Sequence, residues 1–111
     1  MITRYAIFNG TVKAGMESEM RMHVEAVLAP LWRKFACAEK AEIFYGVEQD
    51  KNGPVIPVML AITYADEEAM AKGLNSPARY ESRDLLPAFY EKYFDEVTLW
   101  HYVMETDTAT S

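Results

Sequence analysis

The spacing of apolar residues divides the first third of the chain into a strand and a helix. Residues 3–12 (TRYAIFNGTV) are rich in β-branched and aromatic side chains and stop before a turn signal at residues 13–15, which predicts a strand. From Met16 to about Phe35, apolar residues recur at helical spacing. This segment is therefore predicted to be a helix with one buried face.

Two apolar runs in the middle of the chain flank an Asn-Gly pair. The runs cover residues 41–50 and 54–65, and Asn52-Gly53 lies in the short segment between them. Asn-Gly between apolar runs is a strong hairpin signal, because these residues adopt the positive φ angles of tight turns. We therefore expect two antiparallel strands here.

The remaining third of the chain predicts helices followed by a strand. Asp66 begins a short helix whose acidic first turn suits the N-terminal end of the helix dipole. Ser76 and Pro77 combine a capping side chain with a proline at the first helical position, which predicts a second helix. Pro87 is expected to kink or divide this helix. Residues 95–106 then form the last predicted strand.

This order of elements indicates a fold class. Strand, helix, strand, strand, helix, strand is the βαββαβ arrangement of ferredoxin-like α+β domains, with a four-stranded antiparallel sheet. A chain of 111 residues has room for one core, so we expect a single domain over residues 1–106. Residues 107–111 (DTATS) are expected to be a flexible tail.

Alternation along the last strand indicates that both faces of the sheet are apolar. Leu99 and Val103 point to one side, whereas Trp100 and Tyr102 point to the other. One layer of helices can bury only one of these faces, and an exposed apolar face of this size is an association surface. We therefore expect a homodimer that packs sheet against sheet, forming a dimeric α/β barrel.

Charge and composition exclude several classes of partner and location. The formal charge is −6, and the 11 Lys and Arg residues form no run, which disfavours nucleic acids and anionic membranes as partners. The longest apolar stretch, residues 55–62, is too short to span a bilayer, and no signal peptide is visible. The single Cys37 cannot form an internal disulfide, so a cytoplasmic location is expected.

His23 and Pro30 interrupt the first predicted helix. His23 is the one side chain of near-neutral pKa in this helix, and it falls about 70° from the centre of the apolar stripe. It is a candidate general acid or base, or else a border histidine with one nitrogen bonded and the other in water. Pro30 removes the hydrogen bond to the carbonyl of Ala26, so the helix is expected to bend there.

Candidate ligand-binding residues come from the first strand, the first helix and the last strand. Asn9 places an amide within an apolar strand, where it would orient a ligand oxygen or, alternatively, satisfy a neighbouring loop. The side chains expected to contact a ligand are Tyr5, Val27, Leu31 and Trp100. With His23 and Asn9 in tentative catalytic roles, they make up the candidate site.

The sequence favours neither a metal nor a cofactor. His23 and His101 are the only histidines, and no spacing typical of metal ligands is present, so we expect no metal site and no cofactor. Arg79 and Arg83 share one helix face and are able to clamp an anionic ligand. Acidic neighbours make a solvated, salt-bridged face the stronger interpretation.

Nearly the whole chain resembles the ethyl tert-butyl ether degradation (EthD-like) family of the dimeric α/β-barrel superfamily. The likeness covers the strand order, the helix HVEAVLAPLWRKF, and a short helix ending in Gly73-Leu74-Asn75 before the Ser76-Pro77 step. The first helix is similar to a family pattern with one histidine seven residues before a proline and a second histidine two residues before it. Here His23 and Pro30 match, but the second place holds Leu28.

The resemblance implies a homodimer that binds a small apolar molecule, an aromatic one included. Relatives are implied to include isomerases, dehydratases and cofactor-free oxygenases, together with proteins of no known activity. A cofactor-independent enzyme that uses His23 as general acid or base in small-molecule degradation or biosynthesis is therefore the alternative. Leu28 favours the non-catalytic interpretation, and one fold hosts many chemistries, so the sequence leaves enzyme activity open.

Overall fold

The computed structural model describes residues 1–107, which form four strands and a layer of helices. The predicted tail lies outside the described residues, apart from Asp107. Within residues 1–107, no helix has the length and apolar character needed to cross a bilayer. The elements are β1 (Ile2–Val12), α1 (Glu17–His23), the π-helix η1 (Val24–Leu28), α2 (Ala29–Trp32), β2 (Lys40–Tyr45), β3 (Val58–Tyr64), α3 (Glu67–Leu74), α4 (Pro77–Tyr93) and β4 (Phe94–Glu105).

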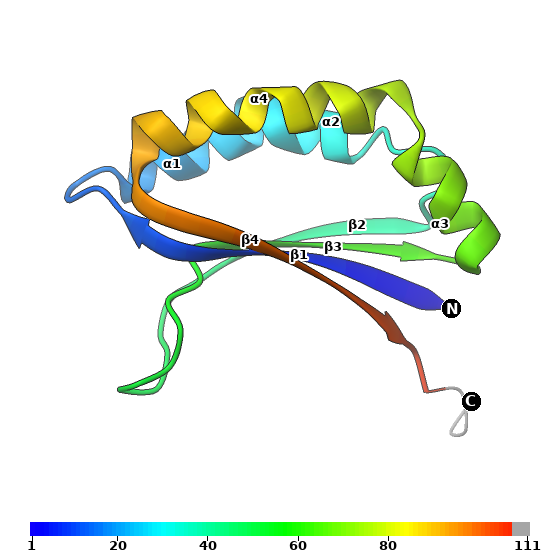
Figure 1. The fold of residues 1–111 in the computed structure, drawn as a ribbon, viewed down its shortest axis with the longest axis horizontal. Coiled ribbons are helices and arrows are strands. Elements are labelled where there is room, and N and C mark those ends of the chain that lie inside the picture. The colour runs from blue at the N-terminus through cyan, green and yellow to red at the C-terminus, as the bar shows by residue number, and fades with distance from the viewer. Residues whose placement is uncertain (108–111) are drawn as a thin grey trace.

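The strands form one antiparallel sheet in the order β2-β3-β1-β4. The long helix α4 and the continuous α1-η1-α2 helix lie together over one face of this sheet (Figure 1). The element order and the antiparallel pairing confirm the predicted ferredoxin-like α+β fold.

The predicted hairpin is present, but its strands are shorter than expected. Residues 46–57, which the apolar runs had assigned largely to strands, instead form the loop between β2 and β3. Pro54 and Pro57 lack the N–H group that a paired strand needs, so the ladder stops short of them. The Gly46 N–H closes the base of the loop on the Pro57 carbonyl at 3.0 Å. In Figure 1 this loop leaves the sheet on the side away from the helices.

Two expectations about the C-terminal helices need correction. Helix α4 runs without interruption through Pro87, which is exposed, so water can replace the missing hydrogen bond. Ser76 occupies the N-cap position, but its hydroxyl donates to the Gly73 carbonyl rather than accepting from the helix. The Asp66 carboxylate does cap α3, accepting from the Ala69 N–H at 2.9 Å.

A π-helical segment precedes Pro30 in the first helix. The Ala29 N–H donates to the Val24 carbonyl, five residues earlier, and the chain continues as α2 without a break. Such a segment places one extra residue in a turn. The wider turn makes room for Pro30, which has no N–H to donate to the preceding turn. The helix therefore accommodates Pro30 by widening the turn before it.

The core lies between the helices and the facing side of the sheet. From the first helix, Met20, Val24, Leu28 and Trp32 point into it and are almost wholly buried. The other buried apolar residues of this core are Ala6, Phe8, Val12, Phe35, Val58, Leu60, Ile62, Tyr64, Phe89, Tyr93 and Phe94. The helices thus cover most of one face of the sheet.

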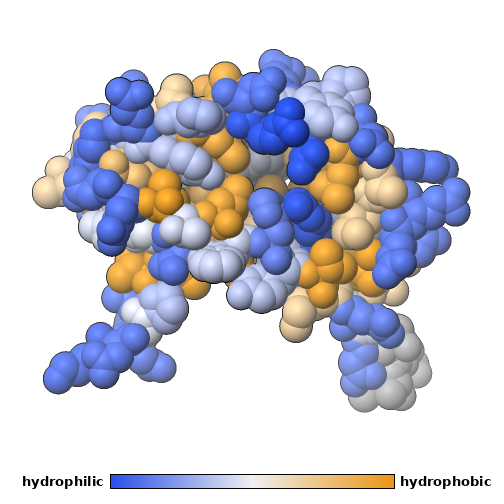
Figure 2. All heavy atoms as spheres, viewed as in Figure 1, coloured by the Kyte–Doolittle hydropathy of each residue, from blue (hydrophilic) through white to orange (hydrophobic). Residues whose placement is uncertain are grey.

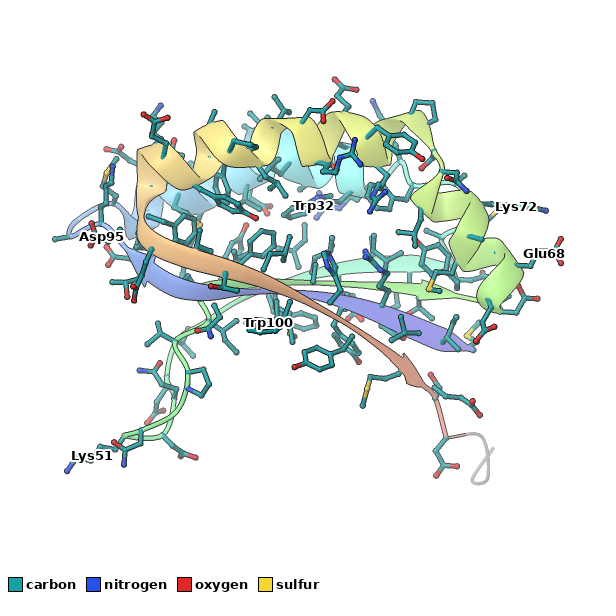
Figure 3. The ribbon with its side chains drawn as sticks, viewed as in Figure 1. Trp32, Lys51, Glu68, Lys72, Asp95 and Trp100 are labelled. Atoms are coloured by element: carbon teal, nitrogen blue, oxygen red, sulfur yellow. The ribbon has the colours of Figure 1, made fainter. Side chains whose placement is uncertain are left out.

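The opposite face of the sheet carries large side chains that no described element covers. Phe44, Trp100 and Tyr102 are 44%, 51% and 52% exposed. Figure 3 shows Trp32 between the helices and the sheet, whereas Trp100 projects from the other side. The alternation predicted for β4 is therefore observed.

Gly73 allows α3 to pack closely on β3, and its replacement provides a test of this contact. A Cβ at this position would lie 2.6 Å from the Tyr64 ring and 2.8 Å from the Ala36 carbonyl oxygen. We expect Gly73→Ala to lower the free energy of unfolding by about 1–3 kcal/mol despite its better helix propensity. Chemical denaturation measures this value.

The exposed Ala71 in the same helix supplies the control for this prediction. Ala71→Gly has no packing contact to change, so it is expected to cost about 1 kcal/mol through helix propensity alone. A Gly73→Ala protein more stable than the original would contradict the close contact.

Candidate functional site

A cavity of about 280 Å³ lies between α4, the end of the first helix and the sheet. Figure 2 shows hydrophilic side chains on both sides of the hollow that separates the helix layer from the sheet. The lining residues are Arg4, Ala6, Phe8, Trp32, Phe35, Leu60, Arg79, Ser82, Arg83, Leu86, Leu99 and His101. Most of this lining is aromatic or aliphatic, and the polar part is basic.

The register of β1 and β4 brings Arg4 and His101 together. Ala6 pairs with His101, and Arg4 pairs with Val103, so Arg4 and His101 are diagonal neighbours on the helix-facing side. From the helix layer, the first two turns of α4 supply Arg79 and Arg83, at positions that share one helix face. Three elements distant in sequence thus supply the basic groups.

The electrostatics of the cavity hold His101 in its neutral form. Burial, together with the positive charges of Arg4 and Arg79, lowers the pKa of His101 to about 4. The ring nevertheless reaches solvent at the edge of the cavity. Burial and the neighbouring charge of Arg79 also lower the pKa of Arg4, although a guanidinium remains protonated at neutral pH.

No carboxylate neutralises Arg4 or Arg79 within the described residues. None of the cavity-lining side chains is acidic, and the ion pairs of residues 1–107 involve other cations. Arg83 pairs with Asp84 at 3.7 Å on the surface, in line with the salt-bridged face expected there. Arg79 donates to the Leu74 carbonyl at 3.4 Å and lies 5.6 Å from the Tyr80 ring centroid, but within the described residues it has no ion pair.

His23 lies away from this cavity and packs against α4. Its ring stacks on Phe89 with a centroid distance of 5.4 Å, and its Nδ1 is 3.3 Å from the Tyr93 hydroxyl. Partial burial and the charge of Lys92 lower its pKa. His23 is not among the cavity-lining residues, so its surroundings are those of the border histidine considered above.

The position that separates this chain from the EthD pattern is part of the core. Leu28 is fully buried in η1, and an imidazole there would have no access to solvent. Val27 and Leu31, expected to contact a ligand, are partly buried on the same helix but do not line the cavity. The first helix contributes Trp32 to the cavity instead.

The other candidate residues lie on the opposite, uncovered face of the sheet. Asn9 and Trp100 line a shallow hollow together with Tyr102, and Tyr5 lines a neighbouring one. The sheet separates them from His23. Within one chain, the structure therefore does not bring Asn9 and His23 to a common ligand.

Arg4 is the cavity residue that sequence reasoning missed. Its signal was present, because in β1 a charged residue alternates with the apolar Ala6 and Phe8 on one strand face. His101 was correctly placed on the face of Leu99 but was considered only as a metal ligand. Within residues 1–107, no three His, Cys, Asp or Glu side chains are grouped as a metal would require.

A second cavity, of about 230 Å³, lies where a side chain anchors the loop between β2 and β3. It lies between β1, α1 and the β2–β3 loop, and Arg21 is its one basic side chain. The Arg21 guanidinium donates to the Gly46 carbonyl at 3.0 Å and lies 5.0 Å from the Tyr45 ring centroid. Its charge is thus used to anchor the loop.

Solved structures share this architecture along nearly the whole chain. An EthD family protein from Bacillus halodurans is 18% identical, with 96% of this chain and 99% of that one covered and a TM-score of 0.72. SnoaB, a cofactor-independent oxygenase from Streptomyces nogalater, is 18% identical over 97% and 94%, with a TM-score of 0.60. A dimeric ferredoxin-like protein of unknown function from Thermobifida fusca is 8% identical over 93% and 92%, with a TM-score of 0.58.

The chain has the ferredoxin-like fold of these proteins. An EthD family protein is among them, so the ferredoxin-like fold of the single chain that the resemblance implied is confirmed. No family model matches the chain, and no curated protein matches it in sequence. At such low identity the likeness concerns the fold, and the chemistry must be argued from the cavity.

The neutral state of His101 is testable by NMR titration. We expect His101 to titrate near pH 4 and Arg4→Met to raise this pKa, because the variant removes a neighbouring positive charge. Arg33→Met, which removes an exposed charge outside the cavity, should leave the pKa unchanged. A His101 pKa of ordinary value in the original protein would contradict the described environment.

The lowered pKa of His101 also predicts how the free energy of unfolding depends on pH. The unfolded chain binds a proton on His101 near pH 6.5, whereas the folded chain binds it only near pH 4. The free energy of unfolding should therefore fall as the pH is lowered through this range. Denaturant titrations of the original protein and His101→Gln measure the effect, and the variant should lose part of the decline. Identical pH profiles would exclude this contribution.

Proposed function

We propose that the protein binds a small, largely apolar molecule, an aromatic one included, in the cavity between α4 and the sheet. The observation that carries the proposal is the lining of that cavity, where Phe8, Trp32 and Phe35 supply aromatic walls. Its volume of about 280 Å³ is close to the lower end of the usual range for ligand sites, about 300–1,000 Å³. A molecule of one or two rings suits this space.

The proposed unit is a homodimer with the uncovered sheet faces packed together. The exposed aromatic side chains of β4 and β2 support this, because a two-fold axis lets one patch cover itself. The dimeric ferredoxin-like protein from Thermobifida fusca, which has the same fold, adds support. In such a dimer Asn9 and Tyr5 belong to the interface, and the ligand cavity stays on the helix side.

Catalysis is a second candidate function, and a neutral histidine at the cavity favours it. His101 lines the cavity and, with its pKa lowered to about 4, is unprotonated at neutral pH and able to accept a proton from a ligand. SnoaB, described as a cofactor-independent oxygenase, shares the fold. In this arrangement His23 acts through packing on Phe89, and His23→Gln is expected to leave ligand affinity unchanged.

Two adjacent leucines on α4 allow a matched test of the cavity. Leu86 lines the cavity, whereas Leu85 is exposed and does not. With 2-naphthamide as probe, Leu86→Trp should weaken binding about tenfold or more, since overfilling costs on the order of 1–3 kcal/mol. Leu85→Trp should bind like the original protein. Calorimetric titration measures both, and absence of binding to the original protein would contradict the proposal.

The dimer is tested by placing a charge in the uncovered face. Trp100→Glu should convert dimers to monomers, because a carboxylate buried without a partner is strongly unfavourable. Met22→Glu is the control, since Met22 is 69% exposed on the helix side. Native mass spectrometry distinguishes the species and detects any co-purified small molecule. A monomeric original protein would refute the interface.

A further inference from the structure

We propose that the ligand of this cavity is an aromatic anion, a carboxylate attached to a ring system, whose charged group is held by Arg4 and Arg79. This inference rests on the proposed ligand-binding function and specifies the class of ligand. The rings would occupy the apolar walls, and the carboxylate would lie at the basic side of the cavity.

The cavity gathers positive charge in an otherwise acidic protein. The chain has a formal charge of −6 and 17 Asp and Glu residues against 11 Lys and Arg, yet no acidic side chain lines this cavity. Three arginines do line it. A random distribution of the charges in this sequence would favour carboxylates there.

Two arginines without a carboxylate partner among the described residues, in one partly buried cavity, are unfavourable unless an anion binds there. Arg4 is partly buried, and its pKa is lowered first by this burial and then by the positive charge of Arg79, which lines the same cavity. Within residues 1–107, neither has a carboxylate partner. An anionic group between them would remove the repulsion and accept charge-assisted hydrogen bonds, which are the strong ones.

Basic and apolar groups lie on different sides of the cavity. Arg4 lies near the N-terminal end of β1, and Arg79 lies in the first turn of α4, so the two charges face each other from the sheet and the helix layer. Phe8 and Trp32 lie deeper, 6.1 Å apart between ring centroids, and are nearly fully buried. A flat ring system with one terminal charge matches this polarity.

His101 completes the recognition without adding charge. Being neutral, its imidazole offers one donor and one acceptor to a ligand that already faces two guanidinium groups. The imidazole could therefore form a hydrogen bond with a hydroxyl or carbonyl group beside the carboxylate on the ring. The inference does not require this second contact.

The test compares a carboxylate with its uncharged isostere. Calorimetric titrations with 2-naphthoate and 2-naphthamide at neutral pH should show the carboxylate binding at least about tenfold more tightly, as expected for charge-assisted hydrogen bonds. Arg4→Met and, independently, Arg79→Met should reduce the affinity for 2-naphthoate toward that of 2-naphthamide. Affinity for 2-naphthamide should fall less than affinity for 2-naphthoate, because the amide carries no charge. Arg33→Met, outside the cavity, is the control for net charge.

A conservative variant separates the charge of Arg4 from its shape. Arg4→Lys keeps the charge but loses the bidentate fork, so its affinity for 2-naphthoate should fall between those of the original protein and Arg4→Met. Thermal unfolding of each variant verifies that it is folded. Because Arg79 belongs to α4, its variant gives a result that does not depend on the strand carrying Arg4.

Different results would refute the anionic ligand class and the proposed ligand site. Equal affinity of the two probes, both blocked by Leu86→Trp, would overturn the anionic ligand class and leave the apolar cavity in place. Carboxylate binding that is unaffected by both Arg4→Met and Arg79→Met would also overturn it. If neither probe binds, the proposed ligand site itself is refuted.

Discussion

The packing of Phe89 determines where a cavity can exist in this fold. Its ring centroid lies 6.4 Å from Phe8 on β1, 5.4 Å from His23 on α1 and 5.3 Å from Phe94 at the start of β4. These contacts join two helices and two strands and fill the space under the second half of α4. Under the first half, Arg79 and Ser82 face the sheet, and a cavity is left. The helix layer is closed against the sheet at one end only.

Local patterns were sufficient to predict the fold but not its boundaries. The order of strands and helices followed from apolar spacing and from turn and capping residues, because these act over a few positions. The loop between β2 and β3 could not be predicted in length, since its prolines matter only once the register of the ladder is known. Likewise, Pro87 was expected to kink or divide α4, but the helix is not divided there. Pro87 is exposed, and this exposure depends on how the helix lies on the sheet.

The candidate site was harder to predict because tertiary contacts define it. Alternation placed His101 and Trp100 on the correct faces, but the meeting of Arg4 and His101 depends on the β1–β4 register. A helical wheel placed His23 at the edge of the apolar stripe, as observed, yet it could not reveal that Phe89 would stack on its ring. Residues from both ends of the chain and from α4 form the cavity, and no short motif records such an arrangement.

The π-helical segment also makes the shape of the cavity independent of the exact length of the first helix. Met20, Val24, Leu28 and Trp32 are four residues apart, and this spacing drifts by about 40° per step around a regular α-helix. The extra residue in the turn of η1 absorbs that drift, so all four side chains face the core. Loss of one residue from η1 would restore regular turns and leave Trp32 on the same helix face. A chain of this fold can therefore gain or lose a residue at this turn while the wall of its cavity stays in place.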